Sequence, residues 1–172
     1  MKWKDWLKKW EMTSLKLTTP FLTMEWSPKE ADRDAAWEMY VELLTRVTTQ
    51  SLPKEHGDEK TALQSVYSLF PITREVLKRH GREAQEFAKL AVVVLNQKIR
   101  PFTAKWHKLS LENAFEKEEM RIKFRKELQQ LQEVLRKYSK MLADMAQVED
   151  LTALEEEEKE PNNKKEKDKK KK

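Results

Sequence analysis

Four polar side chains recur at helical spacing in the most apolar part of this sequence. Asn96, Arg100, Thr103 and His107 stand at positions i, i+4, i+7 and i+11, so on a helix they form one polar stripe. An arginine on the central helix of a bundle is costly unless it is paired. Arg100 therefore requires a carboxylate, a backbone carbonyl or an anionic ligand, and anion binding is the chemistry that the stripe suggests.

Pro101 adds an irregularity directly beside Arg100. A proline removes one backbone hydrogen bond and crowds the carbonyl four residues earlier, here that of Gln97, so it predicts a bend. Such bends often border functional sites. In the alternative interpretation the stripe is structural: Arg100 pairs with an acid such as Glu38 or Glu42, and His107 caps the bent helix beside Trp106.

The spacing of Arg100 and His107 resembles the R-x(4–6)-H signature of HEPN domains, which are helical bundles frequent in bacterial toxins and antiviral systems. The resemblance implies metal-independent RNA cleavage, commonly by two protomers that share one cleft. By analogy, Arg100 would hold the scissile phosphate, and His107 would move protons at the 2′-hydroxyl or the leaving oxygen. Asn96, Thr103 and Lys105 would orient or bind the RNA. Pro101 departs from the family pattern, in which a polar residue usually follows the arginine.

The composition excludes several other kinds of site. The only glycines are Gly57 and Gly81, too few for a phosphate-binding glycine loop, and the absence of cysteine excludes disulfides and thiolate zinc sites. Three separated histidines argue against a preformed metal site, and no cofactor is expected. The longest apolar run, residues 90–95, is far shorter than the roughly 20 residues that span a bilayer. We therefore expect a soluble, cytoplasmic protein without a transmembrane segment.

The elements that must position the stripe are all predicted to be helical. Periodicity and caps predict an all-α, four-helix-type bundle over residues 27–150, with helices near 28–50, 58–80, 82–108 and 113–148. Ser27 to Glu30 forms a capping box for the first helix, and Pro71 should kink or split the second. The valines at 92–94 are assigned to a helix because no partner strand is visible. The fourth helix carries an apolar seam that could brace the bundle or pair with its copy.

Both ends of the chain differ from the central domain. Residues 1–12 form an amphipathic segment whose Trp3, Trp6 and Trp10 share one stripe, and we expect it to dock onto this domain or onto a protein partner. A peripheral membrane contact is the less favoured alternative. Residues 155–172 are glutamate-rich and then lysine-rich, which predicts a disordered tail or, alternatively, a basic arm for RNA or an acidic partner.

The remaining ionisable candidates have structural interpretations. His80 lies in the last turn of a predicted helix, and His56 lies in a predicted loop. Basic residues of the fourth helix could hold phosphates or form an ordinary charged face: Arg121, Lys123, Arg125 and Lys126.

Two functions of different classes follow from these patterns. The first is a HEPN-like ribonuclease or toxin-type effector that acts as a homodimer. The second is a non-catalytic adaptor or regulatory subunit that docks through the tryptophan stripe and the fourth helix. Catalytic Arg100 and His107 side chains must open into a basic cleft, whereas structural ones are buried and paired.

Overall fold

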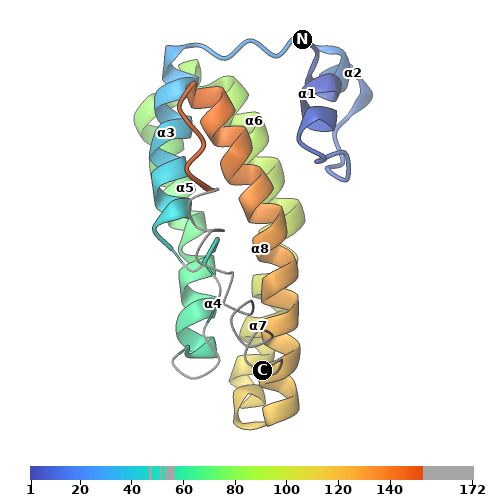
Figure 1. The fold of residues 1–172 in the computed structure, drawn as a ribbon, viewed down its shortest axis with the longest axis vertical. Helices are drawn as coiled ribbons and strands as arrows, with labels where there is room; N and C mark the ends of the chain where they lie inside the picture. The colour runs from blue at the N-terminus through green and yellow to red at the C-terminus, as the bar shows by residue number, and fades with distance from the viewer. Residues whose placement is uncertain (47, 51, 53–56, 153–172) are drawn as a thin grey trace, which may run out of the picture.

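The computed structural model of the chain describes residues 1–46, 48–50, 52 and 57–152 (Figure 1). In these ranges all regular structure is helical, apart from one antiparallel β-bridge between Lys2 and Glu25. The expected all-α class is confirmed, and the valines at 92–94 lie in helix α6 (Gln85–Val94). The predicted tail at 155–172 and His56 lie outside the described residues.

Four helical rods lie side by side to form the bundle (Figure 1). The first rod is α3 (Glu30–Leu44), and the second is α4 (Glu59–Tyr67) followed by α5 (Leu69–His80). The third rod joins α6 to α7 (Arg100–Leu111) through a π-turn (Leu95–Ile99). The fourth is α8 (Glu118–Ala146), which packs against α3, α4 and α7. Short 3₁₀ turns, Gly81–Glu83 and Ala114–Glu116, connect successive rods.

Helix α3 is shorter than predicted because other groups satisfy its ends. It begins at Glu30, since the carboxylate of Asp32 accepts the backbone N–H of Lys29 at 2.8 Å. The same carboxylate, in a residue only 1% exposed, accepts the N–H of Phe87 in the first turn of α6 at 2.9 Å. At the other end, the hydroxyls of Thr48 and Thr49 both donate to the carbonyl of Leu43. The predicted helix over 28–50 with a Ser27 capping box is therefore wrong at both ends.

The second rod is split at Ser68, three residues before Pro71, so the predicted interruption of this helix is confirmed. The hydroxyl of Ser68 donates to the carbonyl of Ser65 at 2.6 Å, and α5 starts at the next residue. Pro71 is the third residue of α5, where a missing N–H costs nothing because the first four N–H groups of a helix have no partner within it. Gly81 ends α5 with φ of 62°, the left-handed conformation that favours glycine.

The third rod contains a π-turn where the sequence predicted a bend at Pro101. The N–H of Arg100 donates to the carbonyl of Leu95, five residues earlier, so this turn holds one residue more than an α-turn. Pro101 follows as the second residue of α7. The wider turn thus ends at Ile99, directly before the start of α7 and two residues before Pro101.

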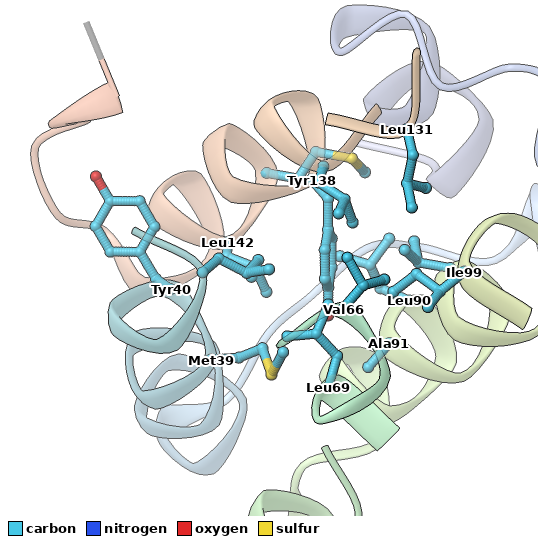
Figure 2. Close-up of a cluster of buried hydrophobic side chains, with 14 of the residues drawn as sticks. Met39, Tyr40, Val66, Leu69, Leu90, Ala91, Ile99, Leu131, Tyr138 and Leu142 are labelled. Carbon is cyan, nitrogen blue, oxygen red and sulfur yellow. The ribbon is translucent and has the colours of Figure 1, made fainter. Parts of the chain in front are cut away.

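The core contains side chains from every rod (Figure 2). Met39 of α3, Leu69 of α5 and Leu90 of α6 surround Tyr138 and Leu142 of α8. Most of the apolar seam predicted on the fourth helix is buried here: Phe124, Leu128, Leu131, Leu135, Tyr138, Met141, Leu142 and Met145. Its exception is Ile122, which is 61% exposed. The seam of α8 therefore braces its own bundle.

The first 26 residues pack against α6 and α8 at one end of the bundle (Figure 1). They contain α1 (Trp3–Lys9) and α2 (Thr19–Thr23). Trp3 and Trp6 are fully buried, and Trp10 is partly buried. The indole N–H of Trp3 donates to Glu86 of α6 at 2.6 Å, and that of Trp6 donates to Asp144 of α8 at 2.6 Å. The stripe thus docks onto its own chain, so Trp3 and Trp6 offer no free surface to a partner.

No helix in the described ranges combines the length and the apolar character that crossing a lipid bilayer requires.

Candidate functional site

Arg100 is exposed at the start of α7, and neutral groups hold its side chain. Its Nε donates to the side-chain oxygen of Asn96 at 3.0 Å, and its guanidinium lies 4.8 Å from the ring centre of Phe70. Among the described residues Arg100 makes no ion pair. Its charge therefore remains available to an anion from solvent.

The carboxylates suggested as partners of Arg100 are engaged elsewhere. Glu38 accepts hydrogen bonds from Arg79 and His80, and Glu42 accepts them from Arg46. The interpretation of Arg100 as a buried arginine paired with one of these acids is wrong. The cause is local: the cations that reach Glu38 come from the last turn of α5, directly across from α3, and Arg46 stands one turn beyond Glu42.

His107 lies on the same helix as Arg100 and is half-buried. Its ring centre is 4.9 Å from that of Tyr67, with the two planes at 72°. Tyr67 in turn lies 5.6 Å from Phe70, the ring beneath Arg100. Tyr67 and Phe70, here called the aromatic pair, therefore link His107 to Arg100. Seven residues of α-helix separate these two side chains by about 10 Å along the axis.

Thr103 and Lys105 are not part of this arrangement. Thr103 is buried, and its hydroxyl donates to the carbonyls of Ile99 and Arg100, both at 3.2 Å. Lys105 forms an ion pair with Glu127 of α8 at 2.6 Å, and the indole N–H of Trp106 donates to the same carboxylate at 2.9 Å. Burial tends to raise the pKa of Glu127, but these two hydrogen bonds and the positive charges of Lys105 and Lys123 together outweigh it and leave the pKa below its usual range. Lys105 thus ties α7 to α8.

Within the predicted stripe the structure joins Asn96 to Arg100 directly and connects His107 to Arg100 only through the aromatic pair. In the sequence, Tyr67 and Phe70 stand at ordinary helical spacing with Leu63 and Val66 in the second predicted helix. No signal in the single sequence separates them from core residues. Tyr67 is 50% exposed at the end of α4, whereas Phe70 is partly buried against the core, a difference set by the folded chain.

Further cations lie on the α4–α5 side of the aromatic pair. Lys60 stands two turns before Tyr67, and Arg74 stands one turn after Phe70. Both side chains are exposed. Helix register therefore puts Lys60 on the same face of α4 as Tyr67, and Arg74 on the same face of α5 as Phe70. Interleaved cations and aromatic rings are typical of surfaces that bind single-stranded nucleic acids.

A cavity of about 740 Å³ lies elsewhere, along α8 between Glu118 and Arg136. Several of its cations hold backbone carbonyls. Arg121 donates to the carbonyl of Phe115, and Arg136 donates to that of Thr49. Arg125 pairs with Glu59 at 2.7 Å and donates to the carbonyls of Leu52 and Gly57. These arginines anchor connecting segments to α8, as expected for a structural charged face.

No family model matches this chain, and neither a curated protein nor a solved structure is similar enough to count as a match.

Proposed function

We propose that this protein is a metal-independent endoribonuclease in which Arg100 and His107 form the catalytic pair. The observation that supports this most strongly is the state of Arg100, which is exposed, held by an amide and an aromatic ring, and without a carboxylate partner among the described residues. A structural arginine would be buried and paired. The spacing of Arg100 and His107 agrees with the HEPN resemblance, which also implies a role as a cytoplasmic toxin or antiviral effector.

The chemistry assigns a separate task to each side chain. Because Nε of Arg100 is bonded to Asn96, the two terminal amino groups are left to hold a phosphate through parallel hydrogen bonds. His107 would take the proton of the ribose 2′-hydroxyl. The 2′-oxygen then attacks the neighbouring phosphorus, the bond to the 5′-oxygen breaks, and the products carry a 2′,3′-cyclic phosphate and a 5′-hydroxyl. Arg100 would stabilise the charge that develops on the phosphate oxygens.

A second copy of the chain would complete this site. The reaction requires two proton transfers, one from the 2′-hydroxyl and one to the leaving oxygen. Among the described residues His107 is the one histidine beside Arg100. In a homodimer, the second proton transfer would come from the partner copy.

The test is RNA cleavage by the purified full-length protein in excess EDTA. We expect the parent to release products with 2′,3′-cyclic phosphate ends and His107→Ala to lose at least about 100-fold in rate, the usual contribution of a general base. Lys108→Ala, at the neighbouring exposed position, is the matched control and should cleave like the parent. A parent without activity, or a His107→Ala variant as active as the parent, would refute the proposal.

The alternative function, a non-catalytic adaptor or regulatory subunit, is favoured less. It was expected to use the tryptophan stripe and the fourth helix for docking. Trp3, Trp6 and most of the seam of α8 are buried within this chain. The surfaces that motivated this alternative are therefore covered by other parts of the same chain.

A further inference from the structure

Tyr67 is an unusually accessible aromatic residue beside the proposed catalytic pair. It is the last residue of α4, and half of its surface, 50%, is exposed to solvent. Large aromatic side chains contribute most to stability when they are buried, so an exposed ring at this position contributes little to the core. Its placement between His107 and Phe70 instead puts it within the candidate site.

The neighbours of Tyr67 restrict the motion of its ring. His107 contacts it in an edge arrangement, and Phe70 lies tilted against it at 5.6 Å. Phe70 is itself partly buried against the core and supports the guanidinium of Arg100. A ring that is already oriented loses little conformational entropy when a planar ligand stacks on it. The Tyr67 ring is therefore already oriented, and its exposed part can stack on a planar ligand at a low entropic cost.

We infer that Tyr67 is a base-stacking residue that binds an unpaired nucleobase next to the phosphate held by Arg100. This inference rests on the proposed ribonuclease function and names the substrate class as single-stranded RNA. A base inside a duplex is covered on both faces by its neighbours, so only an unpaired base can stack on the protein. Stacking tolerates any sequence because every base has a π-face. Lys60 and Arg74 provide charge for the flanking phosphates.

The test measures binding without cleavage. The probe is a fluorescein-labelled 2′-O-methyl RNA strand, which lacks the attacking hydroxyl, either alone or annealed to its complement. Fluorescence anisotropy with the full-length protein should show tighter binding to the single strand. Tyr67→Ala should weaken that binding by about 5-fold to 150-fold, the range for loss of one stacked base. Tyr67→Phe keeps the ring and should bind like the parent.

Two further variants make the result interpretable. Tyr67→Leu keeps apolar volume against Phe70 but removes the ring, so it should lose affinity like Tyr67→Ala while retaining the fold. Trp37→Ala removes another exposed aromatic residue, 46% exposed on α3, and should leave binding unchanged. Circular dichroism checks that both variants keep the fold of the parent.

The two proposals fail in different ways. Equal affinity of Tyr67→Leu and the parent, equal affinity for single strand and duplex, or no binding by the parent would each overturn the stacking role. Cleavage is measured separately on unmodified RNA. A protein that stacks the single strand through Tyr67 but does not cleave RNA would retain this inference and refute the nuclease.

Discussion

The indole N–H of Trp6 donates a hydrogen bond to the carboxylate of Asp144 at 2.6 Å, joining residues 138 positions apart in the chain. The same carboxylate accepts the indole N–H of Trp10 at 3.3 Å and pairs with Lys9 at 2.9 Å. One acidic side chain near the end of α8 thus holds three side chains from α1 and the residue after it. A second polar contact between this segment and α8 joins Glu11 to Lys137 at 2.7 Å, but Asp144 alone accepts the buried indole N–H of Trp6.

Replacing Asp144 should therefore destabilise the protein. Asp144→Ala leaves the buried indole N–H of Trp6 without its acceptor, and an unsatisfied buried donor costs about 1–3 kcal/mol. Urea unfolding measures the loss. Asp34→Ala, at an exposed position on α3, serves as the control and should change stability little. Equal stability of the two variants would contradict the role of Asp144.

Arg100 should matter little for folding. Arg100→Ala removes one hydrogen bond to an exposed amide and one exposed cation–π contact, so we expect a loss of no more than about 1 kcal/mol. Arg125→Ala should lose about 3 kcal/mol or more, because it leaves the buried carboxylate of Glu59 without its partner. Thermal unfolding of both variants separates these expectations. A strongly destabilised Arg100→Ala protein would restore a structural role for this arginine.

Tyr138 offers a stabilising substitution. Its hydroxyl is fully buried and has no hydrogen-bond partner among the described residues, and burial raises its pKa well above the usual range, so it stays protonated. Tyr138→Phe keeps the ring and removes the desolvated hydroxyl, so we expect a gain of about 1 kcal/mol. Tyr138→Ala, by contrast, should lose about 3–5 kcal/mol through the cavity that it leaves. If Tyr138→Phe unfolds at a lower urea concentration than the parent, the hydroxyl has a partner in solution.

Asp58 should make stability depend on acid pH. It caps α4 by accepting the backbone N–H and the hydroxyl of Thr61, both at 2.8 Å, and these bonds lower its pKa below the usual range. At neutral pH, Asp58→Ala should cost about 1 kcal/mol. Because the pKa is lowered in the folded state, this contribution is complete above the unfolded value of about 3.9 and is lost as pH falls through the folded value.

Urea unfolding at neutral and acid pH checks this expectation. The stability difference between the parent and Asp58→Ala should shrink in acid. Asp58→Asn retains a capping oxygen that does not titrate, so its stability should show a weaker acid dependence at this helix end. A difference between parent and Asp58→Ala that is constant with pH would contradict the role of the charged carboxylate.

Local patterns predicted the helices but not their ends. Helical periodicity predicted the rods, and the second helix predicted over 58–80 ends directly before Gly81, where left-handed backbone favours glycine. The start of α3 was missed because Asp32 acts there together with the N–H of Phe87, 55 residues away. A single sequence contains no signal that predicts such a long-range hydrogen bond. The acceptors of the tryptophan stripe, Glu86 and Asp144, escaped prediction for the same reason.

The candidate site was predictable only in the part that lies on one helix. Spacing alone placed Arg100 and His107 in the same helical segment. Tyr67 belongs to a different rod, and its exposure depends on how α4 ends and how α7 packs against it. Thr103 satisfied the spacing equally well but faces inward. Periodicity identifies a face of a helix, whereas packing decides which of its side chains reach solvent.

The π-turn at Leu95–Ile99 has a consequence for insertions and deletions. An extra residue placed in a regular α-helix would rotate everything beyond it by about 100° and move it by about 1.5 Å. Here the wider turn absorbs one residue, so α6 and α7 keep the faces that they present to the bundle. A chain one residue shorter in this segment should form an uninterrupted α-helix with both halves still docked. Removal of one residue is therefore tolerable immediately before Arg100, whereas the same change within α7 would turn His107 away from Tyr67.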